Sequence, residues 1–350
     1  MKKRFNIRKL TKKYREPLYL LVIMFVVVFS TPIAYQLHNR DTEVRLGVSF
    51  SIKASEDLGL DWKKNFLALL DEVQVEHVRL MSYWDLGEPA DNEFMFEDLD
   101  WQIDQATRHN VSVTLAVGQR QPRWPECHIP RWVEDLDETN RQTQLLEYIG
   151  VVVDRYKDFD AVESYQVENE AANSAFGECP PYDPDFLTEE IALVQSLDED
   201  SDVITNVGDQ LGFITGGPAE LADKIGFSMY NNAYTELFGR PFGYTFFLPS
   251  EWHSGRAALV EGLINKPVFV HELQAEPWGV RATRDLTIEE QDRSMNADRI
   301  RSQVNFAKRS GIKEIYLWGG EWWYWRLVEF GDKDLWNTVK DIYQENKASN

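Results

Sequence analysis

Basic residues are scarce in this sequence outside its first seventeen positions. The 350 residues include 37 Lys and Arg against 58 Asp and Glu, which gives a net charge of −21. Residues 1–17 hold eight of the basic residues and one Glu, so subtracting this +7 from the total leaves −28 for the remainder. Nucleic acid and anionic membrane surfaces repel so acidic a domain, which excludes both as expected partners and leaves neutral ligands open.

Sequence patterns for metal, phosphate and serine-nucleophile chemistry are also missing. The histidines His77, His109, His128 and His253 do not form a metal-ligand spacing, and no serine lies in a nucleophile elbow. The segment SFSIKASEDLG (49–59), after the first expected strand, has no Gly-rich phosphate turn, which disfavours an open, doubly wound sheet. We therefore expect neither a cofactor nor a metal.

Cysteine is nearly absent from the sequence. The two cysteines, Cys127 and Cys179, both lie in Pro-containing loop sequence. They could form a disulfide if the domain lies outside the cell, where disulfides persist, and two free thiols are the other possibility. The sequence alone leaves both possibilities open.

One long apolar run is present, directly after the basic N-terminus. Residues 18–37 contain no charge, and as a helix they would span about 30 Å, the thickness of a bilayer core. The excess of Lys and Arg before this run predicts a basic cytoplasmic tail at 1–17 and a single-pass transmembrane signal-anchor at 18–38 in the cytoplasmic membrane, with the domain outside. A cleaved signal peptide shares the pattern, but the basic region is long and no A-x-A site follows.

From residue 43 onward, β-branched and aromatic runs alternate with amphipathic stretches. A segment with helical spacing follows each expected strand, and one of these, residues 287–311, is expected to be a single helix with a Thr287/Glu290 capping box. Eight such β–α units predict an α/β fold, a parallel (β/α)8 TIM barrel over residues 43–347. The expected strands are 44–51, 75–83, 111–118, 161–167, 202–208, 224–230, 267–273 and 314–320.

Polar side chains end many of these strands, at the face where TIM barrels carry their active sites. Glu170 and Glu272 would face each other across the barrel mouth, and glycoside hydrolysis needs such a pair of carboxyl groups. In strand seven, Val268, Val270 and Glu272 share one face of the pleat, so Glu272 points inward if both valines do. The polar strand ends are Arg79 in strand two, Asn169 and Glu170 in strand four, Tyr230 in strand six, Glu272 in strand seven and Trp318 in strand eight.

A strand four that ends in Asn169-Glu170 and a strand seven that ends in Glu272 resemble the retaining glycoside hydrolases of clan A. These TIM-barrel enzymes include cellulases, mannanases, β-galactosidases and β-glucuronidases. The segment FMFEDLDWQIDQATRHNVSVTLAVGQRQPRWPE (94–126) looks like the second-helix and third-strand region of the clan's β-galactosidases. The resemblance extends over most of the domain, from about residue 45 to about residue 325.

The resemblance implies a double-displacement mechanism. Glu170 would be the general acid/base, and Glu272 would be the nucleophile that forms a glycosyl-enzyme. Asn169 would bond to the 2-hydroxyl of the sugar. Arg79 and Tyr230 would keep Glu272 ionised and oriented.

Further sugar contacts are expected around this pair. Trp318 would offer its ring face to the sugar, and Glu276, in HELQAEPWGV (271–280), is a second candidate for the nucleophile or for a sugar contact. The aromatic segments 231–255 and 321–326 follow strands at the working face, so they are candidates for stacking subsites, and a packed rim is the other interpretation. Glu168 has no assigned role.

The expected function is hydrolysis of a β-linked oligo- or polysaccharide by a monomeric enzyme at the cell surface. A carbohydrate-binding or adhesion module that has lost activity is one alternative, which the presence of both Glu170 and Glu272 disfavours. A transglycosylase is the other, and it would use the same residues while excluding water better. The sequence does not distinguish gluco-, manno- and galacto-configured substrates.

Overall fold

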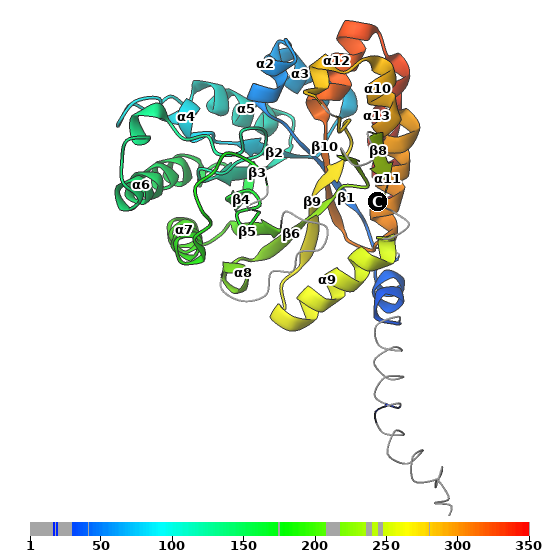
Figure 1. Ribbon diagram of the computed structural model, residues 1–350, viewed down its shortest axis with the longest axis horizontal. Coiled ribbons are helices and arrows are strands. Elements are labelled where there is room, and N and C mark those ends of the chain that lie inside the picture. Colours follow the sequence, from blue (N-terminus) through cyan, green and yellow to red (C-terminus); the bar gives the residue numbers. More distant parts are fainter. Residues whose placement is uncertain are drawn as a thin grey trace, which may run out of the picture.

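Eight parallel strands close into a barrel in the computed structural model, as the alternating pattern predicts (Figure 1). The structure describes residues 17, 19, 30–40, 42–173, 176–207, 218–235, 240–243, 248–279 and 281–349. Each barrel strand lies beside the next barrel strand in the sequence. The strands are β1 (Arg45–Ser49), β2 (His77–Met81), β3 (Ser112–Val117), β4 (Val162–Val167), β5 (Asp202–Val207), β6 (Lys224–Met229), β9 (Val268–Gln274) and β10 (Glu314–Trp318).

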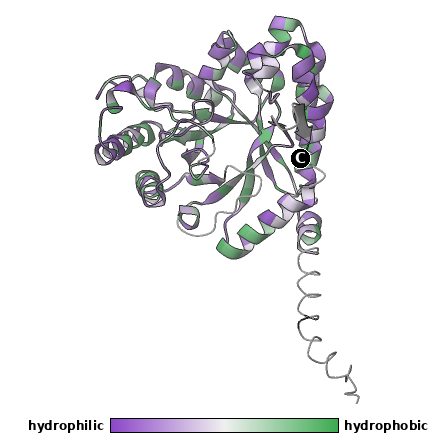
Figure 2. Ribbon diagram, viewed as in Figure 1, coloured by the Kyte–Doolittle hydropathy of each residue, from purple (hydrophilic) through white to green (hydrophobic). Residues whose placement is uncertain are grey.

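Helices surround the barrel, and their turns mix hydrophobic and hydrophilic residues (Figure 2). A separate antiparallel hairpin, β7 (Asn232–Thr235) and β8 (Arg240–Gly243), follows β6. Three short 3-10 or π turns are η1 (Leu69–Val73), η2 (Arg131–Val133) and η3 (Thr283–Asp285). The α-helices are α2 (Ile52–Asp57), α3 (Trp62–Ala68), α4 (Trp84–Gly87), α5 (Glu97–Arg108), α6 (Glu138–Tyr156), α7 (Pro184–Leu197), α8 (Pro218–Leu221), α9 (Ser250–Ile264), α10 (Ile288–Ser294), α11 (Ala297–Arg309), α12 (Gly320–Phe330) and α13 (Lys333–Ser349).

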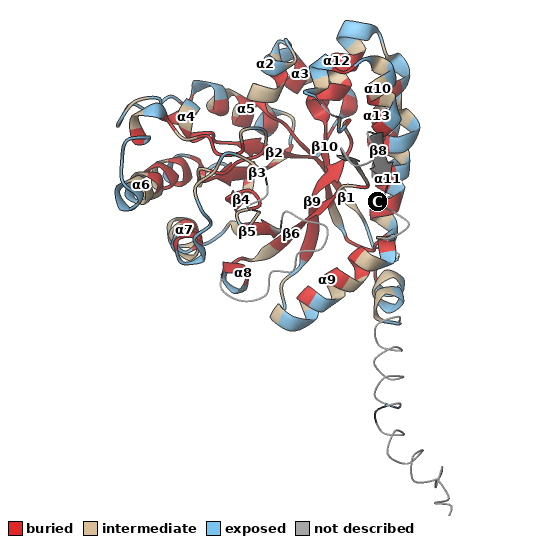
Figure 3. Ribbon diagram, viewed as in Figure 1, coloured by how far each residue is buried: buried red, intermediate tan, exposed pale blue. Residues whose placement is uncertain are grey.

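Helix α6 shows how the sequence specifies these outer elements. Asp137 caps it, because its side chain accepts a hydrogen bond from the Asn140 backbone N–H. Apolar residues then recur every three or four positions and form the stripe that packs on the barrel, while the other faces remain in solvent (Figure 3). The buried stripe is Leu145, Tyr148, Ile149, Val152, Val153 and Tyr156.

The prediction of one long helix over residues 287–311 is wrong, because the chain forms two helices there. The Thr287/Glu290 capping box is present at the start of α10. The backbone then becomes extended at Met295, and Asn296 caps α11 by accepting a hydrogen bond from the Arg299 N–H. An Asn side chain favours such a cap over a place inside a helix, so the local chemistry ends one helix and begins the next.

The aromatic segment 321–326 forms part of α12 and supports the packed-rim interpretation. Trp322 and Trp323 are fully buried and Trp325 is 7 % exposed, so these rings fill the space between α12 and the barrel. Trp322 and Trp323 therefore have no free face for a sugar. The side chains of the other aromatic segment, 231–255, lie partly outside the described residues.

Strand β9 carries a bulge that turns Glu272 into the barrel mouth. Val268 and Val270 belong to the outer core between barrel and helices, whereas Phe269 lies inside the barrel against Tyr316. The prediction that both valines point inward is therefore wrong. The pairing of β9 with β6 shifts from Phe227↔Val270 to Ser228↔Glu272, so the bulge reverses the alternation at Glu272.

Most of the transmembrane segment predicted at 18–38 lies outside the described residues, and among the described ones no helix has both the length and the apolar character needed to cross a bilayer. Residues 30–38 are helical and lie beside α9 (Figure 1). Tyr35 donates to Glu261 of α9 at 3.0 Å, and Gln36 donates to Ser254 at 3.0 Å. This end of the predicted anchor is therefore packed on the domain rather than separate from it.

Candidate active site

Glu272 is a buried carboxylate at the C-terminal mouth of the barrel, with 4 % of its surface exposed. Arg79, from β2, donates to its Oε1 at 2.9 Å, and the Tyr230 hydroxyl donates to its Oε2 at 2.8 Å. Burial alone would raise the pKa of Glu272, but the charge of Arg79 and these hydrogen bonds outweigh it and lower the pKa. Glu272 is thus held as a carboxylate with both oxygens oriented.

The Arg79 guanidinium is itself fixed by neighbouring strands. Its Nε donates to the Ser49 hydroxyl at 2.9 Å, and its Nη1 donates to Gln166 at 3.0 Å. With 1 % exposure, the side chain lies inside the barrel below the mouth. A buried guanidinium with partners on three strands cannot move away from Glu272 without leaving those partners unpaired.

Glu170, at the end of the β4 unit, has a different environment. Its Oε1 accepts a hydrogen bond from the Ser228 hydroxyl at 2.6 Å, and its Oε2 accepts one from the Asn173 amide at 3.0 Å. Its backbone has a φ of 51°, and its N–H donates to Asn206. Two neutral side-chain donors, a hydroxyl and an amide, therefore fix the orientation of the Glu170 carboxyl group.

The two carboxyl groups are close together, as the sequence predicts. Glu170, His271 and Glu272 each present one side-chain oxygen or nitrogen, and these atoms all lie within 4.8 Å of one another. His271 Nε2 is 3.7 Å from an oxygen of each carboxyl group. Retaining glycosidases hold their carboxyl groups about 5–5.5 Å apart and inverting ones about 6.5–9.5 Å apart, and oxygens this close are compatible with the shorter separation.

This cluster and one other in the described residues also have the spacing of metal ligands. The second lies at the opposite end of the barrel and consists of His77, Glu163 and Glu314. Its carboxylates already pair with cations, Glu163 with Arg45 at 2.6 Å and Glu314 with Lys224 at 3.5 Å. In the cluster at the mouth, Arg79 likewise pairs with Glu272 at 2.9 Å.

Glu276 lies in a second charged group, beside the predicted sugar platform. One of its oxygens accepts hydrogen bonds from the Trp318 indole N–H at 2.7 Å and from Arg123 at 2.5 Å. The Arg123 guanidinium lies 4.0 Å from the Trp318 ring centroid and also pairs with Glu321 at 2.6 Å. A cation therefore covers part of the Trp318 ring, and Glu276 orients both side chains.

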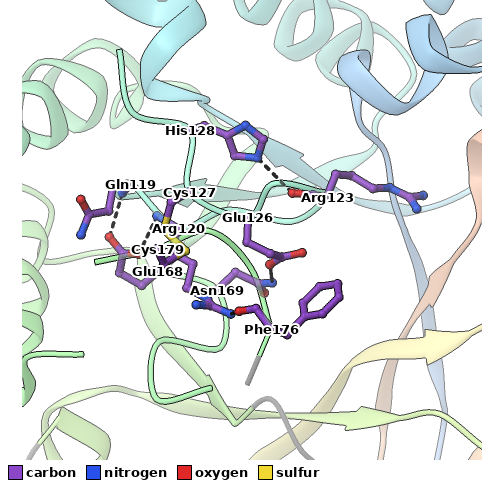
Figure 4. The surroundings of a disulfide bond; sticks show 10 residues. All are labelled: Gln119, Arg120, Arg123, Glu126, Cys127, His128, Glu168, Asn169, Phe176 and Cys179. Atoms are coloured by element: carbon purple, nitrogen blue, oxygen red, sulfur yellow. Dashed lines mark hydrogen bonds between the residues drawn. A yellow bond between two sulfur atoms is a disulfide. The ribbon is translucent and has the colours of Figure 1, made fainter. Parts of the chain in front are cut away.

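Asn169 is fixed by three neighbouring side chains. Its Oδ1 accepts hydrogen bonds from Gln166 at 3.2 Å and from Asn206 at 3.1 Å. Its Nδ2 donates to Glu126 at 3.2 Å, a contact that Figure 4 shows beside the disulfide. An amide nitrogen carries two hydrogens, so one of them remains for a ligand.

Cys127 and Cys179 are joined by a disulfide with a Cα–Cα distance of 5.2 Å (Figure 4). The bond connects the loop after β3 with the loop that follows Glu170. The Glu178 N–H also donates to the Pro125 carbonyl at 3.0 Å. The two loops that border the Glu170 side of the site are therefore fastened together.

Glu168, which the sequence leaves without a role, supports the loop after β3. Its two oxygens accept hydrogen bonds from the backbone N–H groups of Gln119 at 2.8 Å and Arg120 at 2.7 Å. Burial raises the pKa of Glu168 to about 7, and burial also raises the pKa of its neighbour Glu190, with which it shares a hydrogen bond. Glu168 therefore has a structural task, capping a backbone turn.

Sequence reasoning missed three residues that the structure brings to the site, Ser228, Arg123 and Glu126. Ser228 lies near the end of β6, two positions before Tyr230, and it belongs to no known sequence motif. Arg123 and Glu126 lie in the Pro-rich stretch after β3, where apolar residues recur with neither helical nor strand periodicity. Positive φ values of 90° and 74° place these two side chains, and no pattern predicts them.

Comparisons with known proteins place the fold among glycoside hydrolases. No family model and no curated protein matches the chain. A β-galactosidase from the haloarchaeon Halorubrum lacusprofundi is 16 % identical with a TM-score of 0.54, over 78 % of this chain and 52 % of the other. A GH5_18 protein from Bifidobacterium longum subsp. longum is 15 % identical with a TM-score of 0.56, over 79 % and 70 %. Xylanase 10B from Thermotoga petrophila is 14 % identical with a TM-score of 0.54, over 87 % and 94 %.

The barrel fold is the one these glycoside hydrolases share. The likeness extends over most of this chain, although the chain spans only about half the length of the β-galactosidase from Halorubrum and of a second one from Marinomonas. At sequence identities of 14–16 %, the structural likeness shows the fold alone. The chemistry of this chain therefore has to be inferred from its own site.

Proposed function

We propose that this chain is a retaining glycoside hydrolase that cleaves β-linked glycans by double displacement. The observation that carries the proposal is the pair Glu170 and Glu272, with carboxyl oxygens within 4.8 Å of one another at the barrel mouth. Their environments differ as the two roles require. The glycoside hydrolase folds of the compared proteins agree with this reading.

Glu272 is the proposed nucleophile. Its lowered pKa keeps it ionised, and Arg79 and Tyr230 orient its oxygens for attack on the anomeric carbon. The bond from the anomeric carbon to the leaving oxygen breaks as the bond to Glu272 forms. The covalent glycosyl-enzyme is then attacked by water.

Glu170 is the proposed acid/base. It gives its proton to the leaving oxygen in the first step and takes a proton from the attacking water in the second. Hydrogen bonds from the neutral donors Ser228 and Asn173 orient the carboxyl group for both proton transfers.

The other predicted site residues act as sugar contacts in this proposal. Asn169 bonds to the 2-hydroxyl through its remaining N–H. Trp318 and Glu276 contribute with Arg123 as one unit, because the three side chains are bonded to one another. Transglycosylation would use the same residues, and a pure binding module would have no need of an ionised Glu272.

The substrate class is proposed from chemistry and from the compared structures. One GH5_18 structure from Bifidobacterium contains Manβ1-4GlcNAc, and the Thermotoga xylanase structure contains xylobiose. A β-linked oligosaccharide of neutral sugars is compatible with the acidic domain, because neutral ligands are not repelled.

A location at the outer surface of the cytoplasmic membrane is part of the proposal. The basic N-terminus and the uncharged run at 18–37 support it, and so does the disulfide, since disulfides persist in oxidising compartments. Fractionation of cells that express the full chain, followed by protease treatment of intact spheroplasts, tests this placement. Protection of the domain from the protease would contradict it.

The decisive test of the function is product stereochemistry. We expect the protein to hydrolyse at least one member of a panel of aryl β-glycosides and β-glucans. Proton NMR of the first product should show the β-anomer before mutarotation, because two displacements restore the original configuration. An α-anomer as first product would contradict the retaining mechanism, and inactivity on the whole panel would favour the binding-module alternative.

A further inference from the structure

A third carboxyl group, Glu126, lies beside the catalytic pair. Its side chain is 5 % exposed, and among the described residues its side chain accepts a hydrogen bond from the Asn169 amide, with 3.2 Å between Nδ2 and Oε2. Burial, reinforced by the negative charges of Glu272 and Glu170, raises the pKa of Glu126 to about 8, and Arg120 opposes this only weakly. Placing an acid there is costly to the fold.

Glu168 provides the contrast that argues against a purely structural role. Glu168 is also buried beside another carboxyl, but its two oxygens cap the backbone N–H groups of Gln119 and Arg120. In the described residues Glu126 caps no backbone group through its side chain, and Arg120 instead donates to the Phe176 carbonyl at 2.8 Å. The Glu126 side chain therefore supports Asn169 and does not cap the backbone of its own loop, unlike Glu168.

The backbone holds Glu126 firmly in this position. Its φ is 74°, a left-handed conformation that a non-glycine residue adopts at a cost. Gly177 packs against it so closely that a Cβ on Gly177 would lie 2.8 Å from the Glu126 Cβ. The residue after Glu126, Cys127, is joined by the disulfide to Cys179, which follows Gly177 by two positions (Figure 4).

We propose that Glu126 binds the substrate sugar, through the ring hydroxyl next to the one that Asn169 bonds. The inference depends on the proposed glycosidase function, in which Asn169 bonds the 2-hydroxyl. One Nδ2 hydrogen of Asn169 is directed at Glu126, so a hydroxyl on the other hydrogen lies on the same side of the site. The adjacent 3-hydroxyl then comes within reach of Glu126, whose carboxyl group can donate or accept.

The experiment pairs a variant with a modified substrate. We compare wild type, Glu126→Gln and the control Glu178→Gln on an aryl β-glycoside and on its 3-deoxy and 4-deoxy analogues. Glu178 is exposed, lies beside the same disulfide and undergoes the same chemical change. We expect Glu126→Gln to lower kcat/KM for the parent substrate roughly 10- to 100-fold, the cost of leaving a buried hydrogen-bonding group without its partner.

The deciding measurement is how the loss of kcat/KM caused by Glu126→Gln depends on which hydroxyl the substrate lacks. Glu126→Gln should cost little with the 3-deoxy analogue, because the contact is already missing, and should keep its full cost with the 4-deoxy analogue. Glu178→Gln should match wild type on all three substrates. An equal cost of Glu126→Gln on every substrate, or coupling at a different hydroxyl, would overturn the assignment.

The test separates this inference from the proposed function. If wild type hydrolyses no aryl β-glycoside, the glycosidase proposal fails before the variant is compared. If wild type is active and Glu126→Gln is as active on the parent substrate, only the role of Glu126 is refuted. The melting temperature of each variant, measured with bound and without bound sugar, checks folding, and Glu126→Gln should reduce the stabilisation by sugar.

Discussion

The two sides of the barrel mouth surround their carboxyl groups with different hydrogen-bond partners. On the β9 side, Glu272 has a buried cation and a phenol directed at its two oxygens. On the β4 side, Glu170 is held by a serine hydroxyl and an asparagine amide. Both groups are almost fully buried, at 4 % and 7 % exposure, so the difference between them comes from their partners and not from depth.

This difference in partners supports the proposed roles more strongly than position alone does. A cation that is fixed on three strands lowers the pKa of Glu272 and favours its ionised form, whereas the Glu170 carboxyl group is oriented by a hydroxyl and an amide. Glu276 has a cation too, but Arg123 is shared with Glu321, and the group is tied to the Trp318 ring. These contacts favour a supporting role at the rim for Glu276, the second nucleophile candidate, in the proposed mechanism.

Removal of the nucleophile should have the largest effect. We expect Glu272→Ala to lower kcat roughly 10⁴-fold or more, because no glycosyl-enzyme can form. Added azide should restore part of the activity and give a glycosyl azide of inverted configuration, since the small anion fills the vacated space. The rate with an aryl glycoside and the NMR spectrum of the azide product measure this.

Glu276→Ala is the matched control for Glu272→Ala, because it removes the same side chain four residues further along the chain. It should keep turnover within a factor of roughly 10–100 of wild type, through a disturbed Arg123 and Trp318, and azide should add nothing. If instead Glu276→Ala shows the azide-rescued inverted product and Glu272→Ala remains active, the nucleophile is misassigned.

Removal of the acid/base should have a smaller effect that depends on the substrate. Glu170→Ala should slow substrates with poor leaving groups roughly 10²- to 10⁴-fold and spare those with good ones, which need little protonation. Azide should then yield the product of retained configuration, because it attacks the glycosyl-enzyme on Glu272. A plot of log kcat against leaving-group pKa should be steep for the variant and flat for wild type, and two parallel lines would contradict the role.

Weakening the β9 side should move the acidic limb of the pH profile. Glu272 acts ionised, so activity is present above its pKa and is lost as pH falls through that pKa. Tyr230→Phe removes one bond that lowers the pKa, so the loss should begin at a higher pH than in wild type. Measurement of kcat/KM against pH tests this, with Tyr182→Phe, an exposed tyrosine, as the control. An unchanged limb would show that Arg79 alone sets the pKa.

The fold was predictable from the sequence because the same strand-then-helix pattern recurs along the whole domain. Eight β–α units carry the same alternation, and an error in one leaves the barrel intact, as the split of 287–311 at Met295 shows. Glu170 and Glu272 were found because the C-terminal strand ends of a barrel converge. The alternation of side chains along β9 does not give the direction of Glu272, because the strand contains a bulge that no residue pattern predicts. Glu272 still reaches the barrel mouth.

The less predictable residues lie where the backbone leaves regular structure. Arg123 and Glu126 project from a loop with positive φ values, and their partners come from elsewhere in the chain. A periodic pattern fixes direction only inside a helix or a strand, so loop side chains need the folded structure. The role of Glu168 became visible for the same reason, since its partners are backbone groups of another loop.

The smallest expected effect on turnover concerns the disulfide, which lies on the β4 side alone. Replacing Cys127 and Cys179 by Ser should lower stability by up to about 4 kcal/mol, because the bond closes a loop between residues 52 positions apart. Turnover at moderate temperature should fall only a few-fold, since the Ser228 and Asn173 bonds to Glu170 do not pass through the disulfide. Denaturant unfolding and thiol titration of the denatured, unreduced protein measure the two parts. Two free thiols in wild type would refute the bond, and a loss of turnover as large as that of Glu170→Ala would show that the fastened loops, and not the neutral donors, position the acid/base.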